Sequence, residues 1–421
     1  MRKSWALLAA PLGAVLVTAC DSSGTVSLSS DGGGADVQAG SAPPPRLLLS
    51  YYGVASSELV AFGLQSKAVD GRMTYNDPLG TTYVGTTAPW LLEQATDVVA
   101  RLDARQPWVV DASWNVAMND LTDAGYAQSY ADPQAVIVGA GPKAYVLRYN
   151  RNLVGILDTS SAADGGVPIG SIDLSGEVQA AGDGYAQPVA GVFVAAQQRV
   201  YVLLANIDRL DVTAGGFELL CANTTPTVVA IDTTSDTLVD LNGAAPGHGW
   251  PLVGYSPILG PGALAYDALT GSNGRLLVLD AGCNATTGDG GAGSLVKREV
   301  ESLDLATGDA QELLDLTSQA FPGGLTYIDA HHAIVQLDTT ALWDPTATVL
   351  GAAIPNAPDA FAYDGVGNLL GVKKNVDADS GLTGYDVLSV TVPAGTVTKL
   401  GSNPFTLTGG GVAGVTLWPA P

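Results

Sequence analysis

Short apolar segments recur along most of the chain, and tight polar turns separate them. In the clearest example, Ala135–Gly139 and Ala144–Tyr149 flank a turn that contains Gly141 and Pro142. Runs of this length, rich in β-branched and aromatic residues and bounded by Gly, Pro, Asn and Asp, are typical of antiparallel strands. The pattern predicts six such pairs of first and second strands: Asp97–Leu102 with Trp108–Asp111, Ala135–Gly139 with Ala144–Tyr149, Val189–Ala195 with Val200–Leu204, Ala263–Asp267 with Leu276–Leu279, Leu325–Ile328 with Ala333–Leu337, and Ala360–Asp364 with Leu369–Val372.

Two further apolar segments have no partner near them in the sequence. Arg46–Tyr52 has the character of a second strand, and Val412–Trp418 has that of a first strand. Pairing them makes a seventh pair and closes a ring, which removes the exposed edges that an open sheet would leave. Helical periodicity is not sustained in any segment. The sequence therefore predicts an all-β fold, a seven-bladed β-propeller closed by pairing of the N- and C-terminal strands.

One repeat is especially regular. It starts with Tyr145 and Val146, has a second tyrosine at Tyr149 and an asparagine before the third strand, and ends in Asp158 and Thr159. This run resembles the repeat of YVTN-type seven-bladed propellers, and the resemblance implies the same fold. The blades that contain Val228–Thr233 and Glu301–Leu305 match the repeat in part, and those that contain Trp108 and Ala333 are degenerate in their outer strands.

The longest insertions are residues 206–226, 282–299 and 373–384, and all three join a second strand to a third. In a propeller, these connections and the crossovers between blades lie on one face, and the inner hairpin turns lie on the other. We call the face that carries these connections and crossovers the insertion face. A rigid scaffold that displays long loops is typical of a binding surface, so we expect a protein or a small ligand to bind there.

Cys221 and Cys283 fall in equivalent insertions of adjacent blades. Disulfides form in oxidising compartments, and an even number of cysteines remains once Cys20 is set aside. The sequence therefore favours a Cys221–Cys283 disulfide, with two free thiols as the alternative.

The N-terminus carries an export signal. Arg2 and Lys3 precede an uncharged apolar stretch that is too short to span a bilayer as a helix. It ends in Val-Thr-Ala-Cys, which resembles the lipobox of bacterial lipoproteins and implies that Cys20 is lipidated and becomes the mature N-terminus. We therefore expect three parts: a signal peptide over 1–20, a disordered Ser/Gly/Pro tether over 21–45 and the propeller over 46–421. The protein would then be anchored by its lipid at a bacterial cell envelope, with the choice between inner and outer membrane left open.

Charge and composition restrict the partners. The net charge is −23, which repels phosphate backbones, so no nucleic-acid partner is expected. The chain has 3 histidines, and this small number disfavours a multi-histidine copper or zinc centre. We expect no cofactor, with calcium as the one possible exception.

The exception is a twelve-residue stretch with oxygen-bearing side chains at positions 1, 3, 5 and 12, namely Asn375, Asp377, Asp379 and Asp386. The spacing resembles an EF-hand-type calcium loop, in which such side chains surround a hard cation. Ser380 replaces the usual glycine at position 6, and Asp386 is shorter than the usual glutamate. A solvated acidic hairpin loop is the alternative.

Three further residues are candidates for the mouth of the central channel. Asp97 and Asp359 are expected near the starts of first strands, close to the insertion face, and Tyr363 beside them. Paired carboxylates can act as acid and base when both reach one substrate.

The absence of a catalytic motif favours a binding or scaffold protein that uses the insertion face. The alternative is a propeller enzyme, such as a lactonase, a lyase or a quinoprotein-like dehydrogenase, with its site at the channel mouth. The alternative predicts partly buried polar groups there with perturbed pKa values.

Overall fold

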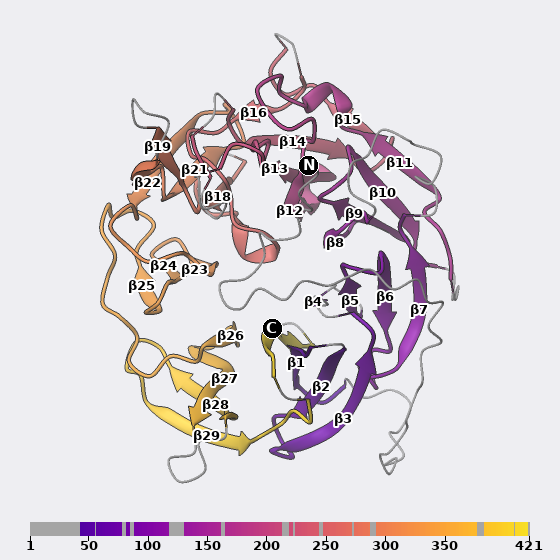
Figure 1. Ribbon diagram of the computed structural model, residues 1–421, viewed down its shortest axis with the longest axis vertical. Coiled ribbons are helices and arrows are strands. Elements are labelled where there is room, and N and C mark those ends of the chain that lie inside the picture. The colour runs from indigo at the N-terminus through magenta and orange to yellow at the C-terminus, as the bar shows by residue number, and fades with distance from the viewer. Residues whose placement is uncertain are drawn as a thin grey trace.

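The computed structural model describes residues 43–54, 56–77, 81–84, 88–117, 130–160, 165–212, 219–221, 224–243, 247–271, 273–286, 292–376, 383–407 and 409–419. Cys20 and most of the 21–45 segment lie outside them, so the lipid anchor stays a prediction. Within the described residues, no helix is long and apolar enough to cross a membrane. Seven antiparallel sheets stand around a central axis, with the indigo and yellow ends of the chain side by side (Figure 1). The chain is a seven-bladed β-propeller, as the sequence predicts.

Each blade is one sheet, and its strands run outward from the central axis. From the innermost strand to the rim, blade one holds β30 (Gly411–Trp418), β1 (Arg46–Tyr52), β2 (Ser57–Gly63) and β3 (Ala68–Tyr75). Blade two holds β4 (Thr81–Val84), β5 (Pro89–Glu93), β6 (Val98–Leu102) and β7 (Val110–Asn115). Blade three holds β8 (Pro133–Val138), β9 (Lys143–Arg148), β10 (Leu153–Asp158) and β11 (Gly170–Asp173). Blade four holds β12 (Pro188–Val194), β13 (Arg199–Leu204), β14 (Thr227–Asp232) and β15 (Thr237–Val239), with β16 (Trp250–Pro251) also on β14.

The remaining blades follow the same plan. Blade five holds β17 (Leu264–Asp267), β18 (Arg275–Leu279), β21 (Glu299–Asp304) and β22 (Ala310–Asp315). Blade six holds β23 (Gly324–Asp329), β24 (His332–Gln336) and β25 (Ala341–Trp343). Blade seven holds β26 (Ala360–Tyr363), β27 (Asn368–Val376), β28 (Thr383–Thr391) and β29 (Val397–Ser402). A separate hairpin, β19 (Cys283–Thr286) with β20 (Ala292–Val296), stands between β18 and β21.

The two ends of the chain close the ring. β30 pairs antiparallel with β1, from Arg46 opposite Trp418 to Tyr52 opposite Gly411. The predicted seventh pair is therefore confirmed. Because β1 covers one edge of β30, the innermost strand of blade one has no unpaired edge on that side.

In blade two, the segments predicted as the first and second strands are the third and fourth strands of the sheet. Val98–Leu102 is the third strand of that blade, and the fourth begins at Val110. The first and second strands are β4 and β5, which the sequence pattern does not mark as a pair. Blade two is thus a full four-stranded sheet. The expected degeneracy holds only for blade six, whose outer edge carries the single bridge between Ala341 and Ala353.

The second strand of a blade is apolar on both sides because neighbouring blades cover both of its faces. All of β13 except Arg199 is buried, and β18 is buried throughout. The outermost strands expose many of their side chains to solvent instead, as β22 does. Burial on both faces explains why the second strands are the more readily recognised in the sequence.

The insertions join second strands to third, as expected. The first lies between β13 and β14, and the second lies between β18 and β21. The described residues of the third are strand, because residues 373–376 belong to β27 and residues 383–384 to β28.

Candidate functional site

The insertions of blades four and five are joined to each other. Cys221 and Cys283 form a disulfide, with their Cα atoms 5.1 Å apart. The amide of Cys221 donates to the carbonyl of Asn284 at 2.9 Å, and the amide of Asn284 donates to the carbonyl of Leu219 at 2.8 Å. The predicted disulfide is confirmed, and it sits inside a short backbone ladder that makes one platform of two insertions.

A half-buried arginine, Arg209, holds the start of the blade-four insertion. Arg209 forms an ion pair with Asp183 and donates to Asn150 Oδ1 at 2.7 Å. Its guanidinium also lies over the rings of Tyr149 and Tyr185, at 5.1 and 4.9 Å from their centroids. Arg209 therefore anchors its insertion both to blade three and to the crossover into blade four.

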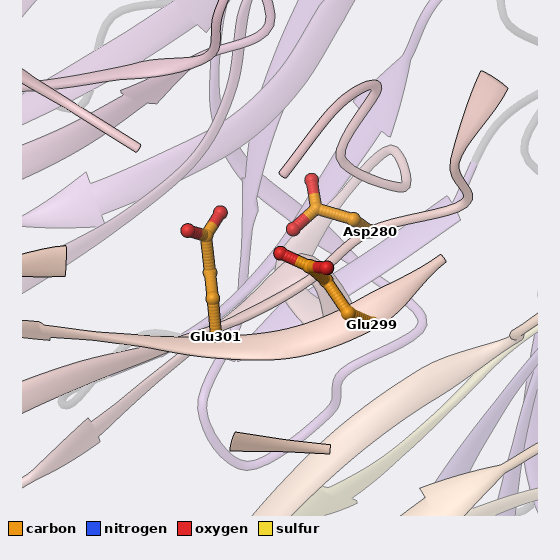
Figure 2. Close-up of side chains that lie close together, drawn as sticks. All are labelled: Asp280, Glu299 and Glu301. Atoms are coloured by element: carbon orange, nitrogen blue, oxygen red, sulfur yellow. The ribbon is translucent and has the colours of Figure 1, made fainter. Parts of the chain in front are cut away.

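Three carboxylates gather at the base of the blade-five insertion. Asp280 directly follows β18, while Glu299 and Glu301 lie two residues apart on β21 and so point to the same side of it. Each offers a carboxylate oxygen within 4.8 Å of one from each of the others. Figure 2 shows the three side chains converging from the two segments. Asp280 and Glu301 are fully buried, and Glu299 is 5% exposed.

The crossover from blade four to blade five covers this cluster, which we call the carboxylate cluster. The amides of Val253 and Gly254 donate to Glu301 Oε2 at 2.8 and 3.3 Å. A Cβ atom on Gly254 would lie 2.4 Å from Asp280 Oδ2 and 2.9 Å from Glu301 Oε1. Only glycine lets the backbone approach the acids this closely.

Burial raises the pKa of all three acids. That of Asp280 lies well above its usual range, because burial and then the charge of Glu301 oppose ionisation. Burial, followed by the charge of Glu301, raises the pKa of Glu299 to about 8. The pKa of Glu301 is raised by burial, against the amides of Val253 and Gly254. The charge of Lys297 favours the ionised forms of all three.

A second group of acids lies on the same face at blades two and three. Asp97 is in the β5–β6 connection, not at the start of a first strand, and its Oδ1 accepts the amides of Ala131 and Asp132 at 2.6 and 3.1 Å. Burial raises its pKa to about 6. Burial, then the charge of Asp97, raises the pKa of Asp132 to about 7. Asp132 directly precedes the innermost strand β8. Of the two acids, Asp132 is therefore the one at the start of a first strand, the position that the sequence pattern assigns to Asp97.

The other two channel-mouth candidates do not meet. Asp359 precedes β26 on the insertion side, and its Oδ2 accepts the amide of Lys374 at 2.7 Å. Tyr363 is the last residue of β26, about 13 Å further along at the usual rise per residue, and so faces the opposite side. Tyr363 therefore does not join Asp359 on the insertion side of the channel.

The candidate calcium loop is only partly within the described residues, because Asp377 and Asp379 lie outside them. Asn375 and Asp386 lie on the paired strands β27 and β28, with Asn375 Nδ2 at 3.5 Å from Asp386 Oδ2. The Asp386 carboxylate already accepts from Lys399 at 2.8 Å and from Ser402 at 3.0 Å. Calcium binding there stays a prediction.

The opposite face carries a shallow pocket of about 290 Å³ lined by His331, His332, Trp343 and Asp344, among others. His332 Nδ1 lies 2.9 Å from Asp329, and both histidine side chains are more than half exposed. These contacts within a hairpin turn give no arrangement of acid, base and nucleophile.

Sequence reasoning missed the carboxylate cluster. The available signal was the pair Glu299 and Glu301, two glutamates on the same side of a strand whose intervening residue is the apolar Val300. Acids at alternate positions of a strand are usual on a solvent-facing side. Only the crossover at Val253 and Gly254 turns that side into an interior.

Comparisons with known proteins support the fold. No protein-family model and no curated protein matches this sequence. Among solved structures, a 6-phosphogluconolactonase-like protein from Bacteroides fragilis is similar with a TM-score of 0.53 at 9% identity, over 91% of this chain and 99% of that one. A similar protein from Bacteroides uniformis gives a TM-score of 0.49 at 10% identity, over 90% and 100%. The periplasmic gluconolactonase of Pseudomonas aeruginosa gives 0.47 at 13%, over 90% and 99%. At these identities the likeness concerns the propeller architecture alone.

Proposed function

We propose that this chain is a lipid-anchored binding protein of the bacterial cell envelope, which presents its insertion face to a protein or small-molecule partner. The supporting observation is the Cys221–Cys283 disulfide, which joins the insertions of two adjacent blades into one platform. A loop that is fixed before binding loses less conformational entropy when a partner docks. The anchoring of the same insertion by Arg209 serves that purpose too.

The membrane attachment rests on the signal and on Cys20. Lipidation of that cysteine would leave a flexible tether before the propeller, so that the insertion face can reach partners near the membrane. Replacing Cys20 with Ala should move the protein from the membrane fraction to the soluble fraction. Unchanged partitioning would exclude the anchor.

Site-specific photo-crosslinking tests which face binds. Leu210 lies in the blade-four insertion and is 65% exposed, while Leu269 lies in the β17–β18 turn on the opposite face and is 69% exposed. A photoreactive phenylalanine analogue at either position replaces the same residue type at nearly equal exposure. In the intact envelope, we expect a discrete adduct from position 210 and none from position 269. Adducts of equal yield at both positions, or none at 210, would contradict the proposal.

A propeller enzyme is the second candidate, and one observation favours it. Asp97 and Asp132 have raised pKa values and lie together on the insertion face near the start of an inner strand. Acids that titrate near neutral pH are suited to general acid–base work. Against this, the Asp97 carboxylate is occupied by two backbone amides. Hydrolysis of a panel of lactones by the wild type, abolished in Asp132→Asn, would favour the enzyme over the binding protein.

A further inference from the structure

The carboxylate cluster has an unbalanced set of oxygens. Four buried carboxylate oxygens have no hydrogen-bond partner: Asp280 Oδ1 and Oδ2, Glu299 Oε1 and Glu301 Oε1. None of the three acids forms an ion pair with any described residue. Leaving buried acceptors without a donor costs free energy for each of them, and several like charges in one small space cost more. Either protons or a bound cation must compensate.

The geometry points to a cation. The three residues offer oxygens within 4.8 Å of one another, so one ion can contact all three at the usual Ca²⁺–oxygen distance of about 2.3–2.6 Å. The other oxygen of Glu301 has a different role, because Oε2 is held by the amides of Val253 and Gly254. Those amides orient Glu301 so that Oε1 turns toward Asp280 and Glu299.

The backbone is shaped to leave the space open. Gly254 lies where any Cβ atom would collide with Asp280 and Glu301. Lys297, the cation whose charge acts on all three acids, lies with its ammonium 6.0 Å from the ring centroid of Tyr255 and makes no hydrogen bond to the cluster within the described structure. A side-chain cation therefore does not fill the position between the carboxylates.

We propose that Asp280, Glu299 and Glu301 bind one divalent cation of the Ca²⁺ class at the base of the insertion face. Oxygen-only ligands select hard cations over transition metals. One oxygen from each of the three residues, completed by waters, can meet the six to eight ligands that Ca²⁺ takes, whereas Mg²⁺ demands stricter octahedral geometry. This site is separate from the predicted loop over residues 375–386, and it does not depend on whether the insertion face binds a partner.

The bound ion would join three segments. Asp280 leads into the disulfide-linked insertion, Glu301 holds the blade-four crossover, and Glu299 begins β21. Calcium would thereby fix the β19–β20 hairpin and the crossover to blade five. An exported protein meets calcium concentrations at which even moderate sites fill.

Calcium titration of the metal-free full-length protein by calorimetry tests the site, with thermal melting as a second measurement. We expect one ion per chain at this cluster and a melting temperature that rises by about 3 °C at roughly 100 times the dissociation constant. The variants Asp280→Asn and Glu301→Gln keep the shape and the amide contact of Glu301 but remove the charges. In each variant, calcium affinity should fall by at least tenfold, and the melting temperature in chelator should equal or exceed that of the wild type.

Asp386→Asn is the matched control, because it removes one charge from the other candidate loop. It should leave the calcium response of the carboxylate cluster unchanged. Magnesium at the same concentration should give a smaller shift. Absence of calcium binding by the wild type, or binding that survives both cluster variants and is lost in Asp386→Asn, would overturn the proposal. If protons alone neutralise the cluster, the wild type will not bind calcium there.

Discussion

Buried carboxylates repeatedly hold the crossovers between blades. Glu58 accepts the amides of Thr406 and Leu407 at 2.7 and 3.2 Å, just before the closing strand β30. Asp97 and Glu301 do the same for the crossovers into blades three and five. Successive amides form a concave anion-binding turn, and a carboxylate is a fitting partner for it. Single acids thus fix the loops of the insertion face.

The cost of such burial appears in the dependence of stability on pH. Asp132 has its pKa raised from 3.8 to about 7. Between these values the folded state binds a proton that the unfolded state has lost, so this group stabilises the fold at acid pH and the contribution disappears as pH rises through 7. Asn keeps the acceptor for Gln134 and tolerates the left-handed backbone, where φ is 57°.

We therefore expect Asp132→Asn to melt close to the wild type at pH 4 and about 2 °C or more above it at pH 8. Asp158→Asn is the control, because it removes the same charge from an exposed turn where hydrogen bonds from Ser160 lower the pKa. That variant should show no gain at pH 8. Melting curves across this pH range decide the matter, and a gain of equal size in both variants would attribute the effect to net charge instead.

At the scale of the element, the strands of blades three, four, five and seven are predictable because turns with Asp, Thr and Gly mark each end. Blade two shows the limit. Any two adjacent antiparallel strands give the same alternation, so the pair at Asp97–Asp111 does not reveal its place within the sheet. The missed strand β5 starts at Pro89, and Pro78 and Gly80 precede β4. These residues usually mark turns.

The site was less predictable than the fold. The disulfide could be predicted because both cysteines fall in equivalent insertions of adjacent blades. The carboxylate cluster depends on which loop covers one side of β21, and that is set by the packing of a crossover 48 residues away in the sequence. No local pattern contains this information.

The disulfide gives a prediction for the insertions. Closing a 62-residue separation adds about 4 kcal/mol to the free energy of unfolding in the chain-entropy model, less any strain. A Cys221→Ala, Cys283→Ala double variant should therefore unfold at a lower urea concentration than the wild type. Reductant should move the wild type to the same midpoint and leave the double variant unchanged. If reductant shifts both proteins equally, the bond is not the cause.

At the scale of the whole molecule, the fold depends on closing the ring between the two chain ends. Seven pairs of residues join β1 to β30, and Trp418 Nε1 donates to the carbonyl of Ala104 at 2.8 Å in blade two. β30 therefore completes blade one and also fastens it to its neighbour. Each blade in a ring buries its faces against two others, so one missing inner strand exposes the apolar residues of β1 and of the blades beside it.

Deleting residues 409–421 should abolish the cooperative melting transition and cause aggregation, because β1 becomes an exposed apolar edge. A circular permutant separates the loss of the strand from a change in the order of the chain. It joins residue 419 to residue 45 through a linker of about four residues and opens the exposed turn at Gln65 and Ser66, since Trp418 lies opposite Arg46. This permutant keeps the β1–β30 pairing and should melt in one transition near that of the wild type. Circular dichroism melts with size-exclusion chromatography compare the three proteins, and a truncated chain that melts like the wild type would contradict a fold held by ring closure.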